Sequence, residues 1–311
     1  MSNIRNLKFK IACMMSHWMR QKIYAYKAAR RKKQAQSVES LLKDMRNILI
    51  HNFPAENVPP ATGKLRLLQE GNACFLKLFA SKCEDYGLRY WLDYGSLLGA
   101  IRHKGFVPWD DDLDVSMMRQ DYDKLLELLP VLFPREEGFH WRKHAFLQIG
   151  YGNTPLNLDV YPYHFAAESY SLDIKSKIDR ALSKIKKRIV FMDGNINYTD
   201  SQIQTMIQQE VLDGKESLHE QATPAIFLSP AVTFTKNSIF PYDAIFPLKR
   251  AMFEGSELTV PHCSRQHLAF FFGDYMSYPP VVGYQHSSVE RMVKTTPFEA
   301  EVNKFIDTYG V

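Results

Sequence analysis

Cysteine is scarce in this chain, and the few cysteines present form no recognisable motif. The 311 residues include only Cys13, Cys74, Cys83 and Cys263, which lie far apart and contain no C-x-x-C pair. This spacing argues against a structural zinc site and against a disulfide framework. It favours a reducing compartment, so we expect a cytosolic location.

Long hydrophobic runs are also missing. No apolar run approaches the roughly 20 residues that a membrane-spanning helix needs, and the first residues lack the apolar core of a secretory signal peptide. Hydrophobic residues make up 45% and charged residues 23% of the chain, which is typical of globular proteins and excludes disorder throughout. We expect one large or two smaller folded domains.

Acidic residues are absent from the first 38 positions. This segment holds ten lysines and arginines, whereas the remainder carries 29 basic and 34 acidic residues. A mildly acidic body therefore follows a basic N-terminal arm. Such an arm is attracted to phosphates, on nucleic acid or on anionic lipid.

The arm also has a helical apolar pattern. Ile4, Leu7, Ile11, Met14 and Trp18 recur at spacings of three and four residues. One interpretation is a helix lying in a membrane interface, which predicts a peripheral protein on the inner face of the cytoplasmic membrane. The other is a helix that docks on its own domain or on a second subunit. The pattern fits both.

Prolines between residues 53 and 60 mark the clearest boundary in the chain. They separate a basic amphipathic helical arm over 1–52 from a domain over 62–300, with residues 165–225 as a helical insertion. Helices are predicted over 62–86, with Thr62 as its cap and Gly87 as its end, and over 97–102, 119–129 and 171–192. Strands are predicted over 88–92, 113–117, 145–151 and 156–161, a turn over 93–96, and mixed strand and loop over 225–285.

Four aspartates within five residues are the most unusual feature of the sequence. Asp110, Asp111, Asp112 and Asp114 stand in the run WDDDLDV. Such crowded carboxylates repel one another unless solvent or a cation is near. On an extended strand, residues two apart share a face. Asp110, Asp112 and Asp114 would then point together and Asp111 away, which predicts a site for Mg²⁺, or for Mn²⁺, on that face. An acidic surface loop is the alternative.

A glycine turn precedes this cluster. Gly95 and Ser96 follow a strand-like run and lead into a helix, where backbone N–H groups could approach a phosphate. The turn and the D-x-D pattern together resemble the nucleotidyltransferase superfamily that includes DNA polymerase beta. That resemblance implies a third carboxylate on a later strand, and Asp159 in LDV matches it.

The resemblance to one family is closer still. The sequence resembles the LicD family, which includes phosphocholine transferases and is similar to the fukutin group. The matching motifs are YGSLLGAIRHKGFVPWDDDLDV (94–115), RQDYDKL (119–125), LDVYP (158–162), IFPLK (245–249), FEG (253–255), VP (260–261), and FGDYM with PP (272–280). Together they span roughly residues 70–290. They imply an α+β fold with a nucleotidyltransferase-like mixed β-sheet flanked by helices.

The resemblance also implies a reaction. Family members would transfer phosphocholine or a related phospho-alcohol from a CDP-linked donor to a hydroxyl of a cell-surface glycan, such as a lipopolysaccharide, teichoic acid or capsule precursor, and release CMP. Asp112, Asp114 and Asp159 are the expected metal ligands. Asp110 would ligate or shape the site, and Asp159 could instead accept the proton of the attacking hydroxyl.

Basic residues are expected to bind the phosphates. Arg102, His103 and Lys104 lie between the glycine turn and the aspartates, and Lys249 lies in a later motif. His286 is a candidate substrate ligand. Each of these residues could instead be an ordinary surface charge or a structural side chain.

Aromatic residues near the motifs could hold a quaternary ammonium group such as choline. Trp109 and Tyr161 are the main candidates, with core packing as the alternative.

Two other functions stay open. One is a transferase that uses CDP-ribitol, CDP-glycerol or a nucleotide as donor. The other is a nucleic-acid-binding protein that uses the basic arm. The acidic body argues against the latter, so no nucleic-acid partner is expected.

Overall fold

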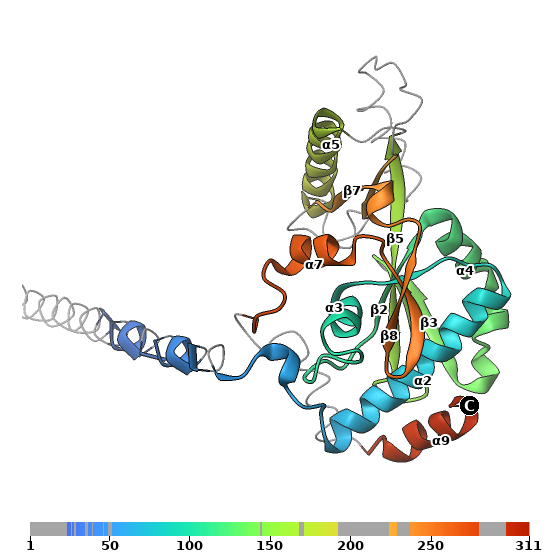
Figure 1. Ribbon diagram of the computed structural model, residues 1–311, viewed down its shortest axis with the longest axis horizontal. Helices are drawn as coiled ribbons and strands as arrows, with labels where there is room; N and C mark the ends of the chain where they lie inside the picture. The colour runs from blue at the N-terminus through green and yellow to red at the C-terminus, as the bar shows by residue number, and fades with distance from the viewer. Residues whose placement is uncertain are drawn as a thin grey trace, which may run out of the picture. The chain divides into compact units, whose positions relative to one another are not determined.

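The chain divides into two units by its internal contacts, Met1–Ala55 and Glu56–Val311 (Figure 1). The computed structural model describes residues 52–143, 145–167, 171–191, 224–228, 237–279 and 297–310, and residues 24–48 except 26, 28, 35, 36, 39 and 46. In the first unit, every described residue from 24 to 48 is helical. Within the described ranges, no helix is long and apolar enough to cross a membrane.

A mixed β-sheet forms the centre of the second unit. Its main path runs β1-β2-β5-β4-β3, and β6 and β7 extend it from β5. The pair β2 and β5 is parallel, whereas its other pairs are antiparallel. The strands are β1 (Trp91–Leu92), β2 (Asp114–Met118), β3 (Phe139–Lys143), β4 (Leu147–Tyr151), β5 (Asn157–Ala167), β6 (Ala225–Leu228) and β7 (Ile239–Pro241), with a separate hairpin of β8 (Lys249–Phe253) and β9 (Ser256–Val260).

Helices flank this sheet, which confirms the predicted α+β class. The helix α2 contacts β5 and α9, whereas α3 contacts β2, β8 and α7 (Figure 1). The helices are α2 (Gly63–Asp85), α3 (Tyr94–Arg102), α4 (Arg119–Leu132), α5 (Leu172–Phe191), α7 (Ser264–Phe272) and α9 (Glu299–Tyr309), with short 3-10 turns at Ala55–Asn57, Arg135–Glu137 and Tyr242–Ala244.

Aromatic side chains bind α2 and α9 to the sheet. Phe75 of α2 lies in the core, with ring centroids 5.8 Å from Phe139 of β3 and 5.5 Å from Phe305 of α9. Leu68 and Phe79 on the same helix are fully buried. Removing a side chain of this kind from a core costs about 3–5 kcal/mol, so α2 is a firmly anchored element beside the sheet.

Three sequence predictions need correction. The predicted turn over 93–96 is instead the start of α3, because the Asp93 carboxylate accepts the Tyr94 N–H and caps the helix three residues earlier than expected. Thr62 occupies the cap position of α2, but its side chain makes no capping hydrogen bond. The segment 225–285, predicted as mixed strand and loop, also contains a helix, α7.

The ends of the predicted insertion also belong to the sheet. The strand β5 runs on to Ala167, and β6 begins at Ala225 and pairs antiparallel with β5. Residues between these strands therefore connect two sheet neighbours. The described part of that connection is α5, an amphipathic helix as predicted.

Candidate active site

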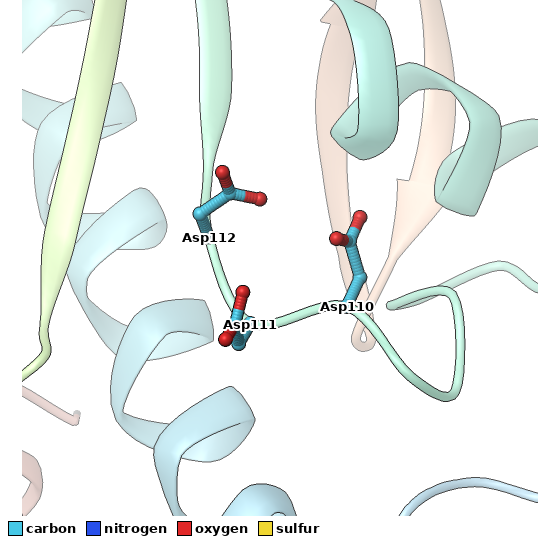
Figure 2. Close-up of side chains that lie close together, drawn as sticks. All are labelled: Asp110, Asp111 and Asp112. Carbon is cyan, nitrogen blue, oxygen red and sulfur yellow. The ribbon is translucent and has the colours of Figure 1, made fainter. Parts of the chain in front are cut away.

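Three carboxylates gather on the segment that leads into β2. One oxygen each from Asp110, Asp111 and Asp112 lies within 4.8 Å of the others (Figure 2). The strand itself begins only at Asp114, so the alternation expected of a strand does not govern these positions. Asp111 was predicted to face away, and this is corrected: its carboxylate belongs to the cluster and is 4% exposed.

The other two predicted carboxylates meet across the sheet. Asp114 on β2 is registered with Asp159 on the parallel strand β5. The Tyr161 hydroxyl donates to Asp114 Oδ1 at 3.0 Å and lies 3.5 Å from Asp159 Oδ2. Gln148 of β4 donates to Asp159 Oδ1 at 2.7 Å. Strand pairing thus fixes two carboxylates that are 45 positions apart in the sequence.

Burial and mutual repulsion change the acidity of this pair. Burial raises the pKa of Asp114 well above its usual range, and the charges of Asp112, Asp110 and Asp159 raise it further. Burial also raises the pKa of Asp159 to about 6, with Asp112 adding to the effect. A cation bound nearby would lower both pKa values by stabilising the ionised carboxylates. Hard oxygen donors in such a crowded arrangement fit Mg²⁺ or Mn²⁺.

Gly95 and Ser96 both form hydrogen bonds with Asp114. The Gly95 N–H donates to Asp114 Oδ2 at 3.1 Å, and the Asp114 N–H donates to Ser96 Oγ at 2.9 Å. Both residues lie in the first turn of α3, where the helix dipole favours negative charge. The glycine predicted to approach a phosphate therefore binds a carboxylate in this structure.

A side chain at position 95 has no room. A Cβ there would lie 2.5 Å from Asp110 Oδ2 and 3.4 Å from Asp114 Oδ2. Because the φ of Gly95 is not in the left-handed region, close approach of the two carboxylates, and not backbone conformation, requires glycine here.

The three basic candidates after α3 have different surroundings. Arg102 is buried and donates from Nη1 to the carbonyls of Tyr275 at 2.6 Å and Ser277 at 3.3 Å. Its Nε donates to His103 Nε2 at 2.9 Å. Burial, and then the charge of Arg102, lower the pKa of His103 to about 4, so His103 is neutral at pH 7. Lys104 is exposed and has a positive φ.

The two aromatic candidates are already packed. The Trp109 ring stacks on Tyr278 with centroids 6.1 Å apart, and Arg102 Cζ lies 5.8 Å from its centroid. The Tyr161 ring packs edge-on against Tyr94 at 5.1 Å. Trp109 therefore lies beside a cation next to the carboxylates, and Tyr161 contributes its hydroxyl to them.

Two candidates are not placed at the carboxylates. Lys249 begins β8 and is exposed, and the hairpin turn at Glu254 lies at the other end of that strand. That turn, and not Lys249, contacts the segment before the aspartates, where Glu254 accepts the Phe106 N–H at 3.1 Å. His286 lies outside the described residues.

A buried Asp93–His267 pair was not predicted. His267 Nε2 lies 2.7 Å from Asp93 Oδ1, and Ser116 and Tyr163 donate to Asp93 Oδ2 at 2.7 and 3.3 Å. Burial acts to raise the pKa of Asp93, but the charge and hydrogen bond of His267 lower it overall. The pair joins α7 to the start of α3. Because 174 positions separate the two residues, no local pattern could reveal it.

Known proteins are similar in sequence to the part of the chain that contains the site. Residues 87–204 match the family model for the LicD/FKTN/FKRP nucleotidyltransferase domain. The matched range contains β1 to β5, α3 and all five aspartates of the site.

Curated relatives match in shorter segments. The Haemophilus influenzae lipopolysaccharide cholinephosphotransferase LicD is 46% identical over 67 residues, which are 21% of this chain and 25% of that protein. The Mus musculus ribitol 5-phosphate transferase FKRP is 36% identical over 88 residues, 26% of this chain and 18% of that protein. An uncharacterized Rickettsia prowazekii protein is 49% identical over 97 residues, 25% of this chain and 35% of that protein. The chain thus covers about a third or less of each of these relatives.

Proposed function

Residues 87–204 belong to the LicD family, and from this premise we propose that the protein transfers a phospho-alcohol from a CDP-linked donor to a hydroxyl of a cell-surface glycan and releases CMP. Phosphocholine is the group we favour. The observation that carries the proposal is the convergence of five carboxylates, from the segment before β2 and from the paired strands β2 and β5.

The metal is part of the proposal. Asp112, Asp114 and Asp159 would hold Mg²⁺ or Mn²⁺, with Asp110 and Asp111 close enough to contribute. A bound divalent cation would neutralise charge on the pyrophosphate of the donor and on the departing CMP. The raised pKa values of Asp114 and Asp159 support this: burial is the larger cause and neighbouring carboxylates add to it, and a bound cation would favour the ionised forms against both.

If Asp159 is not itself a metal ligand, it is suited to receive a proton instead. In the proposed step, the acceptor hydroxyl oxygen bonds to the phosphorus next to the alcohol, the bond from that phosphorus to the CMP oxygen breaks, and the hydroxyl proton passes to Asp159. The pKa of Asp159, raised to about 6 by burial, places it near neutral pH, where a general base is most effective. Gln148 orients the carboxylate by donating to Oδ1, at 2.7 Å, which leaves Oδ2 facing Tyr161.

Two donors fit the relatives named above. One relative is named for cholinephosphate transfer to lipopolysaccharide and another for ribitol 5-phosphate transfer. Trp109 and Tyr94 are half-exposed aromatic residues close to the carboxylate segment or to Tyr161, and either could contact a choline headgroup. We favour phosphocholine because the matched segment is more similar to the cholinephosphotransferase, and we keep CDP-ribitol as the competing donor.

Thermal unfolding with candidate donors tests the function. We would compare CDP-choline, CDP-ribitol, CDP-glycerol and CTP, each with and without Mg²⁺, and then measure CMP release with the donor that stabilises most. A ligand that binds only the folded state stabilises it by about 2.7 kcal/mol when present at 100 times its Kd, and this raises the melting temperature. Mg²⁺-dependent stabilisation by CDP-choline is expected. If none of the CDP-alcohols stabilises the protein, the proposal is wrong.

Retention on heparin tests nucleic-acid binding. Carboxylates line the described site, and they would repel a phosphate backbone in the absence of metal. We therefore expect the body without residues 1–36 to elute from heparin at low salt. Strong retention of that fragment, together with no response to CDP-alcohols, would favour the nucleic-acid interpretation.

Membrane attachment through the arm is a separate part of the proposal. The stripe from Ile4 to Trp18 lies outside the described residues, but the described helical residues carry a second one: Val38, Leu41, Leu42, Met45 and Ile48 recur on one helix face and are all more than half exposed. Four consecutive cations, residues 30–33, precede it. An apolar face next to a basic cluster suits an anionic membrane surface, so we place the protein peripherally on the cytoplasmic face.

A further inference from the structure

Two buried side-chain amides of α2, which lie outside the sequence motifs described above, hold the backbone of the segment that carries Asp110, Asp111 and Asp112. Residues 110–112 precede β2 and have no strand partner. Gln69 Nε2 of α2 donates to the Asp110 carbonyl at 2.8 Å and lies 3.4 Å from the Val107 carbonyl. Asn72 Nδ2, one turn later on α2, donates to the Asp111 carbonyl at 2.8 Å. Gln69 is 1% and Asn72 0% exposed.

The spacing of these donors matches the spacing of the acceptors. Residues three apart on a helix lie on one face, one turn apart. Two such amides therefore reach two successive carbonyls of a segment that runs alongside the helix. The helix itself cannot shift easily, because Leu68, next to Gln69, and Phe75, one turn after Asn72, are fully buried in the core.

A third residue on the same face holds the beginning of the segment. Arg66 donates to both carboxylate oxygens of Glu254, at 3.1 and 2.8 Å. Glu254 in turn accepts the Phe106 N–H at 3.1 Å, and its own N–H donates to the Lys104 carbonyl at 3.0 Å. The row Arg66, Gln69 and Asn72 thus fixes residues 104–111 at both ends.

Repulsion among the carboxylates explains why the backbone of this segment needs these hydrogen bonds. Three carboxylates with oxygens within 4.8 Å repel one another, and the segment that bears them lacks a β-ladder to resist that repulsion. We infer that Gln69 and Asn72 are positioning residues, which hold the backbone of Asp110 and Asp111 so that their carboxylates and that of Asp112 stay gathered for a divalent cation and the phosphates of the donor. The inference rests on the proposed function for what the gathered carboxylates bind, but its statement about the backbone does not.

The test uses Gln69→Met and Asn72→Leu, singly and together, in the full-length protein. Both changes keep the side-chain volume and remove the donor. Asn237→Leu is the matched control, because Asn237 also donates through Nδ2 to a carbonyl, that of Asp179 at 3.2 Å, far from the aspartates in sequence. Hydrogen exchange of the peptide covering 107–114, Mn²⁺ affinity measured with the metal alone, and kcat and KM for CMP release are the three measurements.

We expect faster exchange in 107–114 for each variant and not for the control. We also expect a rise of about 10- to 100-fold in the Mn²⁺ dissociation constant, which is the usual effect of removing a group that orients a ligand, and a loss in kcat greater than any change in KM. Unchanged exchange in a folded variant, or an effect no larger than that of Asn237→Leu, would overturn the inference. If the double variant does not fold, the single variants decide. If the wild-type protein binds no Mn²⁺ and releases no CMP, the proposed function is wrong. The exchange measurement still tests whether Gln69 and Asn72 hold the backbone of Asp110 and Asp111.

Discussion

Asp114 and Asp159 face each other on parallel strands, in direct register between β2 and β5. Parallel strands require a crossover connection, and here it includes α4, β3 and β4. The result is a carboxylate pair from distant parts of the chain, beside the first turn of α3. Each carboxylate is less than a tenth exposed, so their charge depends strongly on what binds between them.

Replacing a carboxylate of the cluster by an amide should separate activity from stability. We expect Asp112→Asn and Asp114→Asn each to lower CMP release by at least about 100-fold, since a metal ligand is lost. The free energy of unfolding without metal should stay the same or rise, because repulsion within the cluster falls. Asp85→Asn, on the exposed end of α2, is the control and should change neither. Near-normal turnover in either site variant would remove that residue from the metal site.

The contribution of Asp159 to stability without metal should fall as the pH rises through the acid range. The folded protein keeps the Asp159 proton up to a pKa of about 6, owing first to burial, whereas an unfolded aspartate loses it near about 4. The folded state therefore binds more protons between these values, and raising the pH across that window costs stability. Mg²⁺ needs the ionised form, so its stabilising effect should be small at pH 5 and large at pH 7.5. Melting temperatures across this range measure both trends.

Asp159→Asn is the control for this pH dependence. It removes the titrating group, so the slope without metal should flatten between pH 4 and 6. A slope identical to that of the wild-type protein would show that Asp159 titrates normally.

Losing the Tyr161 hydroxyl should move the metal response to higher pH. That hydroxyl donates to Asp114 and thereby favours its ionised form. Without it, Asp114 should hold its proton to a higher pH, so Tyr161→Phe should need a higher pH for the same Mg²⁺ stabilisation and should lose about 10-fold in turnover near pH 6, as expected for one hydrogen bond to a charged group. Tyr163→Phe is the comparison, because its hydroxyl contacts Asp93 instead. An equal shift in both variants would contradict the assignment.

Gly95→Ala should abolish function without unfolding the protein. Alanine is favoured over glycine within a helix by about 1 kcal/mol, yet its Cβ would meet Asp110 Oδ2 at 2.5 Å. We expect Mg²⁺ stabilisation and CMP release to be lost in a folded protein. Gly87→Ala is the mirror control: nothing lies within 4 Å of its Cβ position, but its φ is +62°, so it should lose about 1–2 kcal/mol of stability and keep its activity. Retained activity in Gly95→Ala would show that the carboxylates can move apart.

Binding to anionic vesicles should have two separable parts. Each Lys or Arg of the arm near such a surface contributes about 1 kcal/mol, and salt screens this contribution. The apolar contribution is not screened, so Trp18→Ala and Leu41→Ser with Met45→Ser should each make release by salt easier. Lys43→Gln should reduce only the salt-sensitive part. If the full-length protein does not bind phosphatidylserine vesicles even at low salt, the arm is better interpreted as a docking helix for a protein partner.

The amino-acid sequence alone was enough to predict a set of candidate site residues and the family that they resemble. The run from residue 94 to 115 and the LDV at 158–160 are contiguous motifs, so their identity needs no tertiary information. The α+β class was implied by that resemblance, and the periodicity of continuous segments predicted helices at the positions of α2, α4 and α5. Such local patterns are readable from sequence because each helix or strand buries one face, and the apolar residues of that face recur at a regular spacing.

The arrangement of those residues depends on contacts between segments that are distant in the sequence. Asp110 and Asp112 were expected to share a strand face with Asp114, but β2 begins at Asp114, and in the described part of the chain it pairs with β1 and with residues 159–163 of β5. The gathering of Asp111 with its neighbours, the use of Gly95 to bind Asp114, and the Asp93–His267 pair all depend on contacts between distant segments. Such contacts form only when the core brings the elements together, and no periodicity within one segment records the chemistry of its neighbour.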